Sequence, residues 1–252
     1  MTRTFVVSDA HSHPELIEQA LDDGGFTPGE DAFIYAGDLL DRGPDSAGCI
    51  ELVERYATEA LVGNHELAVL LDFNMWGRDW DSRGFRQLLM DKVLSGTPEA
   101  AWKVATCCEG VLMTHAGVSS RYQEVLDRDC QSDPAQLAAH LNAEFLAAVR
   151  HELETGEWDE YGILGEGGPL WFRPVPYSDR MPLSGIRQVV GHTPPLPELE
   201  ARGFWMVDPC VWMMMDGLKR VRYAVIEEGE VRVAELSPAQ GKAELAHAGG
   251  PR

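Results

Sequence analysis

Short apolar stretches that each end in a polar cluster are the feature that most constrains how this chain folds. In the first third of the sequence three such stretches, rich in β-branched or aromatic residues, are Thr4–Val7, Ala32–Tyr35 and Ala60–Val62. The segments between them, 14–21 and 44–56, have apolar residues at helical spacing. This alternation predicts an α/β fold with a largely parallel sheet, in which ligands bind beyond the carboxyl ends of the strands.

The pattern continues further along the chain. Val111–Met113 and Ile186–Val190 are strand-like and lead to His115 and His192. Between them, residues 133–154 begin with the capping pair Asp133-Pro134 and have the spacing of one long amphipathic helix. We expect this helix to belong to an insertion beside the site.

The remaining segments are less regular. Residues 67–109 predict an irregular helical region in which Trp76, Trp80 and Trp102 anchor the core. Three antiparallel strands are expected near the carboxyl end, at 203–208, 218–226 and 230–236. We expect one domain over 1–236, with a helical insertion at about 119–166 and a frayed tail at 237–252.

Charge and cysteine usage narrow the class of protein. The 41 acidic residues outnumber the 21 basic ones, and the net charge of -20 disfavours nucleic acid and anionic lipid as partners. A phosphorylated substrate stays compatible, because a bound cation reverses the local charge. Five cysteines without C-x-x-C spacing, and no signal-peptide or membrane-spanning stretch, predict a soluble protein of the cytoplasm. No sequence feature specifies an oligomeric state.

The polar residues at the strand ends share oxygen and imidazole donors and include no thiolate. The candidate metal ligands are Asp9, His11, Asp38, Asn64, His115 and His192. These donors suit manganese, iron or zinc, and six exceed what one four-coordinate ion needs. We therefore expect two divalent cations, with Asp38 as the carboxylate that bridges them.

Three neighbouring residues complete the predicted chemistry. Arg42 presents a permanently charged planar fork that suits phosphate oxygens. His65, if a carboxylate such as Asp41 orients it, can protonate a departing alkoxide. Together with two cations, these groups predict hydrolysis of a phosphate ester.

Five motifs, in this order and spacing, resemble the signatures of calcineurin-like metallophosphoesterases, above all the phosphoprotein phosphatase branch with its bacterial and phage members. They are Asp9-x-His11, Gly37-Asp38-Leu39-Leu40-Asp41-Arg42-Gly43, Gly63-Asn64-His65-Glu66, His115-Ala116-Gly117 and Gly191-His192-Thr193. The resemblance covers roughly residues 5 to 210 and implies a four-layer sandwich, with two mixed β-sheets flanked by helices. Leu170-Trp171-Phe172-Arg173 is similar to a motif that provides a second phosphate-binding arginine, Arg173.

The resemblance also implies a role for each residue. Asp9, His11 and Asp38 would hold one metal, and Asp38, Asn64, His115 and His192 the other. Arg42 and Arg173 would bind the phosphate, with His65 and Asp41 supplying the proton. The sequence departs from the family pattern at Ser8 and Ser12, where glycines are usual, and at Pro209-Cys210, where a threonine-glycine pair is common.

The function implied is direct attack of a metal-activated water on a phosphomonoester, with protein phosphoserine or phosphothreonine as first choice of substrate. Hydrolysis of diadenosine tetraphosphate or a related nucleotide is the alternative, because the same metal core serves both reactions. A catalytically inactive binding protein is a third, remote hypothesis. Manganese is the expected metal, with iron or zinc as alternatives.

Overall fold

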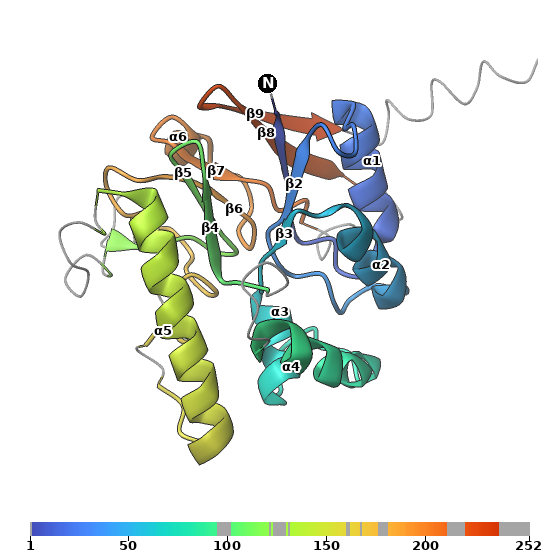
Figure 1. The fold of residues 1–252 in the computed structure, drawn as a ribbon, viewed down its shortest axis with the longest axis vertical. Helices are drawn as coiled ribbons and strands as arrows, with labels where there is room; N and C mark the ends of the chain where they lie inside the picture. The colour runs from blue at the N-terminus through green and yellow to red at the C-terminus, as the bar shows by residue number, and fades with distance from the viewer. Residues whose placement is uncertain are drawn as a thin grey trace, which may run out of the picture.

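The described residues of this computed structural model are 2–94, 102–120, 122, 130, 132–159, 162–166, 168–175, 181–210 and 220–236. They form two mixed β-sheets that pack against each other, with helices on the outer faces (Figure 1). This is the two-sheet sandwich that the motifs imply. The predicted tail at 237–252 lies outside the described residues.

The first sheet has the strand order β3-β2-β1-β8-β9. Its bounds are β1 (Thr4–Val7), β2 (Ala32–Tyr35), β3 (Glu59–Ala60), β8 (Val221–Glu227) and β9 (Glu230–Leu236). The first three strands are parallel, as predicted, and β8 and β9 add an antiparallel hairpin beside β1. Two crossover helices, α1 (Pro14–Gly24) and α2 (Ser46–Tyr56), lie on the outer side of this sheet (Figure 1).

The second sheet has the order β4-β5-β6-β7, with bounds β4 (Ala105–Cys108), β5 (Val111–Thr114), β6 (Arg187–Val190) and β7 (Phe204–Met206). Two expectations were wrong here. The segment expected to be helical up to residue 109 contains strand β4, whose partner is the next strand along the chain. Strand β7 is parallel to β6, because α6 (Pro197–Glu200) carries the chain back before β7 begins.

Alternation along the strands explains how the layers pack. Val6 of β1 and Met113 of β5 belong to one buried cluster, which fills the space between the two sheets. Phe5 lies one residue away and packs with Leu16 of α1 on the outer side. Successive side chains of a strand point to opposite faces, so each strand serves two cores at once.

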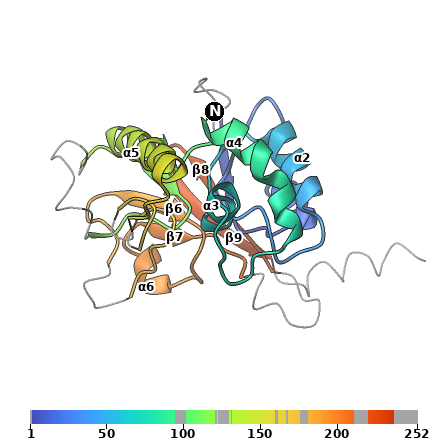
Figure 2. The same ribbon diagram turned by 90° about the horizontal axis from the view of Figure 1, so that it is seen from below.

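Four more helical segments complete the described fold: α3 (Asn64–Leu71), the short 3₁₀ helix η1 (Asp81–Phe85), α4 (Arg86–Leu94) and α5 (Pro134–Thr155). Helix α5 packs on β4 and β5 and forms the outer layer of the second sheet, on the opposite side of the molecule from α2 (Figure 2). Within the described ranges, no helix is both long enough and apolar enough to cross a membrane.

The prediction that tryptophans anchor the core in this region holds for only one of the three. Trp102 is 6% exposed, whereas Trp76 is 74% and Trp80 75% exposed. The two exposed rings lie between α3 and η1, where each packs against an arginine. Helical spacing could not separate them from core residues, because it carries no information about which neighbours fold against a segment.

Candidate metal centre

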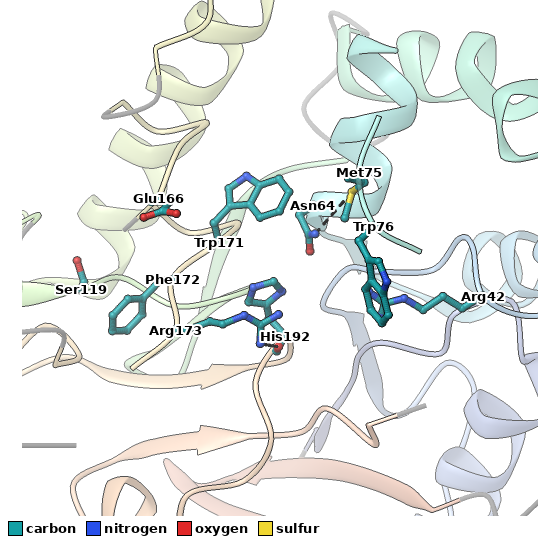
Figure 3. Close-up of a pocket in the computed structure, with 10 residues that line it drawn as sticks. All are labelled: Arg42, Asn64, Met75, Trp76, Ser119, Glu166, Trp171, Phe172, Arg173 and His192. Atoms are coloured by element: carbon teal, nitrogen blue, oxygen red, sulfur yellow. Dashed lines mark hydrogen bonds between the residues drawn. The ribbon is translucent and has the colours of Figure 1, made fainter. Parts of the chain in front are cut away.

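Ten predicted site residues converge where the strand ends of the two sheets meet. Asp9 and His11 follow β1, and Asp38, Asp41 and Arg42 follow β2. Asn64 and His65 open α3, His115 follows β5, His192 follows β6, and Arg173 comes from the loop before β6. A pocket of about 320 Å³ is lined by Arg42, Asn64, Arg173 and His192, among others (Figure 3). A second cavity of about 280 Å³ is lined by Asp9 and Asp38 together with both arginines.

Much of the backbone at this centre is left-handed. Asp9, His11, Asp38, Asp41 and Arg42 have φ values of 54°, 46°, 56°, 70° and 66°. Such conformations cost about 1–2 kcal/mol each for L-residues and persist only where surrounding contacts hold them. These turns aim several polar side chains at the same small volume.

Glu66 provides much of that support. Its carboxylate is buried and accepts hydrogen bonds from the backbone N–H groups of Asp38 (2.8 Å), Leu39 (2.9 Å), Leu40 (3.0 Å) and Gly63 (2.9 Å). It stands at the third position of α3, so its bond to the Gly63 N–H satisfies a backbone donor at the start of that helix. Sequence reasoning gave Glu66 no role, although a glutamate three residues after the helix cap was a usable signal.

One group of possible metal ligands comprises His11, Asp38 and His65. The His11 Nδ1–H donates to the carbonyl of Leu40 (3.0 Å), which leaves Nε2 facing Asp38 Oδ2 at 3.6 Å. Burial lowers the pKa of His11 to about 3, so its imidazole is neutral and Nε2 carries a lone pair that can accept a hydrogen bond or bind a metal. The Arg42 guanidinium donates to this same Nε2 (2.8 Å) and thus places positive charge where a cation would bind.

A second group comprises Asp38, His115 and His192. His115 Nε2 lies 3.3 Å from Asp38 Oδ1, 3.2 Å from His192 Nδ1 and 3.0 Å from the Asn64 side-chain oxygen. Oxygen and imidazole acceptors that converge in this way fit a divalent cation between them. Both groups share Asp38, as expected of a bridging carboxylate.

Charge within the centre is strongly coupled. Burial alone would raise the pKa of the Asp38 carboxyl, but His115 and His65 outweigh burial and hold that pKa well below its usual range. Burial opposes protonation of His115, yet Asp38 raises its pKa to about 9. The pair is therefore ionic when no cation is bound, and a bound cation would displace the His115 proton.

Two further carboxylates stand beside these groups. Asp9 belongs to neither group; its Oδ2 accepts from Ser8 Oγ (2.6 Å) and from the backbone N–H of His192 (3.0 Å). Its role as a metal ligand stays a prediction. Asp208, which sequence reasoning missed, follows β7 and lines the same cavity as Asp9 and Asp38. Burial raises the pKa of Asp208 to about 6, and Asp38 adds to this effect.

The predicted proton donor and the phosphate clamp also lie together. His65 Nδ1 lies 2.5 Å from Asp41 Oδ2, and both side chains are fully buried. Among the described residues, no group pairs with His65 Nε2, so this atom is available to a ligand. Arg173 donates to the carbonyl of His192 (2.6 Å), which places its guanidinium on the pocket wall opposite Arg42 (Figure 3).

Comparison with known proteins assigns the class. A family model described as calcineurin-like phosphoesterase matches residues 2–212. This chain therefore belongs to the calcineurin-like phosphoesterase family, whose members hydrolyse phosphate esters. The histidine and aspartate groups described above are accordingly placed to bind metal.

Among individual proteins, the chain is similar to serine/threonine-protein phosphatase 1 of Salmonella typhimurium, with 36% identity over 31% of this chain and 40% of the relative. It is also similar to a symmetrical bis(5'-nucleosyl)-tetraphosphatase of Enterobacter, with 26% identity over 58% of this chain and 54% of the relative. The chain thus spans about half the length of these relatives or less. A solved structure of a cold-active protein tyrosine phosphatase variant superposes with a TM-score of 0.58 at 16% identity, covering 92% of this chain and 80% of the other. At that identity the likeness concerns the fold alone.

Proposed function

We propose that this chain hydrolyses phosphomonoesters by direct attack of water on phosphorus, with two divalent cations held around Asp38. Bound there, such cations would lower the pKa of a water molecule and draw charge from the phosphoryl group. Manganese is the first metal to test, since the donor set combines oxygen and imidazole ligands.

The remaining chemistry falls to side chains of this chain. Arg42 and Arg173 bind the phosphate oxygens from two sides and stabilise the charge that develops on them. The imidazole of His65 gives its proton from Nε2 to the departing oxygen, while Asp41 holds the ring through Nδ1. Asp9, His11, Asn64, His115 and His192 complete the proposed ligand set.

The observation that carries this proposal is the arrangement around His65 and Asp38. His65 has one nitrogen bound to Asp41 at 2.5 Å and the other unpaired within the described structure. Asp38 lies next to it and belongs to both groups of possible metal ligands. A proton donor beside a shared carboxylate is what hydrolysis of a phosphate ester needs.

The test is turnover of 4-nitrophenyl phosphate by purified protein with manganese. We expect Asp38→Asn to abolish most activity by weakening both metal sites. We expect His65→Asn to lower kcat for phenyl phosphate, whose basic phenolate needs a proton to depart, by about 10²–10⁴-fold, the usual contribution of a positioned acid or base. Robust turnover of phenyl phosphate by both variants, with folding unchanged by circular dichroism, would refute the proposal.

The substrate class is a separate proposal. Phosphoserine or phosphothreonine in protein is the first candidate, because the Salmonella relative with 36% identity carries the name of a serine/threonine phosphatase. Diadenosine tetraphosphate is the second, since the tetraphosphatase relative aligns over more of this chain, 58% against 31%. Competition of a phosphoserine peptide against diadenosine tetraphosphate, compared by kcat/KM, chooses between them.

A further inference from the structure

The loop between α3 and η1 lies against Asp41 and Arg42, and the proposed mechanism gives it no role. We call residues 76–79 of this loop the clasp. They follow α3 in the sequence and come from a part of the chain that none of the five motifs includes. The clasp contacts Asp41, which orients the predicted proton donor His65, and Arg42, which is predicted to bind the phosphate.

Asp79 is bonded to both residues at once. Its Oδ2 accepts the backbone N–H of Arg42 at 2.8 Å, and its own N–H donates to Asp41 Oδ1 at 3.0 Å. Asp79 is itself held by Ser82, whose hydroxyl donates to the Asp79 carbonyl at 2.7 Å. The Asp41 carboxylate is therefore held on both oxygens, by the clasp on Oδ1 and by His65 on Oδ2.

Trp76 and Gly77 contact the Arg42 side chain. The Arg42 guanidinium carbon lies 5.2 Å from the centre of the Trp76 ring, within the range of a cation–π contact (Figure 3). A Cβ on Gly77 would lie 2.8 Å from Arg42 Nε, so only glycine lets the loop approach this closely. The clasp thus limits where the guanidinium can lie.

Asp41 and Arg42 need such support. Both have left-handed backbones, with φ values of 70° and 66°, a conformation that is unfavourable for L-residues and above all for a long side chain such as that of Arg42. Trp76 is 74% exposed, so its ring adds little to the buried core. Its contact with Arg42 and its place on the pocket wall are the features that distinguish it.

We propose that the clasp is a positioning element for this site: Asp79 fixes Asp41 and, through it, the His65 imidazole, while Trp76 fixes the Arg42 guanidinium. This inference rests on the roles that the proposed function gives to His65 and Arg42. Asp79 is expected to act on protonation of the leaving group, and Trp76 on binding of the phosphate. A general loss of folding would impair both steps together, so separate effects on the two steps distinguish positioning from unfolding.

The Asp79 half is tested with a matched pair of substrates, phenyl phosphate and 4-nitrophenyl phosphate. The rings have the same shape, but the phenolate of the first is strongly basic, with a pKa of about 10 as in tyrosine, and needs a proton to depart. The nitrophenolate departs without one. Asp79→Ala keeps the backbone N–H that bonds Asp41 but removes the carboxylate that ties residue 79 to the Arg42 N–H and so holds this N–H in place. We therefore expect Asp79→Ala to lower kcat for phenyl phosphate at least about tenfold more than for 4-nitrophenyl phosphate.

Asp79→Asn is the conservative variant. Its side-chain oxygen can still accept the Arg42 N–H, so we expect it to restore the wild-type ratio of the two rates. Asp79→Ala lowering both rates by the same factor would overturn this half of the proposal. Failure of the wild type to hydrolyse either substrate would refute the proposed function itself, which keeps the two failures distinct.

The Trp76 half is tested by phosphate binding, with Trp80 as the control. Trp80 is equally exposed, and it packs on Arg83 at 4.3 Å without lining the pocket. We expect Trp76→Leu to weaken binding of inorganic phosphate, measured calorimetrically, by about three- to fivefold and to raise KM for both substrates equally. Trp80→Leu should change neither. Equal effects of the two substitutions, or none from Trp76→Leu, would overturn the assignment.

Discussion

At the level of single residues, the centre depends on backbone groups as much as on side chains. Glu66 binds the N–H groups of Asp38, Leu39 and Leu40 and thereby shapes the turn that aims Asp38 at both ligand groups. Ser12, where the family usually has a glycine, adopts a left-handed φ of 59° and donates or accepts a hydrogen bond with Ser46 at 2.6 Å. A serine therefore forms this left-handed turn, and its hydroxyl has a hydrogen-bond partner.

Glu66→Gln tests this support. Glutamine keeps the volume but replaces one acceptor oxygen with an amino group that faces N–H donors, so buried donors lose their partner. We expect the free energy of unfolding to fall by about 2–4 kcal/mol, together with weaker manganese binding. Chemical denaturation and metal titration measure the two effects. Glu51→Gln on exposed α2 is the control, with a change within about 0.5 kcal/mol; equal stability of both variants would contradict the expectation.

Among the helices and strands, α5 is tied to the second sheet by hydrogen bonds as well as by apolar packing. Asn142 of α5 accepts the N–H groups of Val104 and Ala105, each at 3.0 Å, and donates to the carbonyl of Ala105 at 2.8 Å. Phe145 of the same helix is 2% exposed and lies in the large core cluster. The helix thus fixes the start of β4, whose partner β5 leads to His115.

Phe145→Ala is expected to lower the free energy of unfolding by about 3–5 kcal/mol, because it leaves a cavity beneath α5. Arg150→Ala, on the exposed side of the same helix, should change it by less than about 0.5 kcal/mol. Denaturant unfolding followed by circular dichroism measures both. A small effect of Phe145→Ala would mean that α5 is not part of the cooperative core.

Across the molecule as a whole, the candidate centre joins the two sheets. Asp38 comes from the first sheet, and His115 and His192 come from the second. The carboxylates of Asp9 and Asp208 lie beside them and are buried. A cation bound among these groups would hold the sheets together and offset repulsion between the carboxylates.

Metal removal should therefore destabilise the protein in a pH-dependent way. The pKa of Asp208 is raised to about 6, above that of the unfolded chain, so without metal its contribution to stability is lost as pH rises through that value. A cation also binds better as protons leave its ligands, so manganese should raise Tm more at about pH 7.5 than at about pH 5. Thermal unfolding with manganese or a chelator measures this. An equal shift at both pH values would contradict it, and Asp208→Asn should reduce the difference.

Local features of the protein follow from its amino-acid sequence alone. Short apolar stretches predict β1 and β2, and helical spacing with capping signals predicts α1 and α5. The polar residues that follow each strand are the candidate ligands. Because parallel strands end at one edge of a sheet, the sequence also predicts that Asp9, Asp38 and Asn64 meet there. The order and spacing of the motifs indicate the family and the two-sheet sandwich.

Features that depend on distant partners emerge only in the folded chain. Three such features are strand β4, the parallel direction of β7 and the exposure of Trp76 and Trp80. They depend on which segments pack together, and the spacing of apolar residues does not indicate this. Glu66, Asp79 and Asp208 became visible for the same reason. Glu66 and Asp79 bond backbone groups far away in the sequence, such as the N–H of Arg42 for Asp79. Asp208 shares a cavity with Asp9 and Asp38, and only folding brings these three residues together.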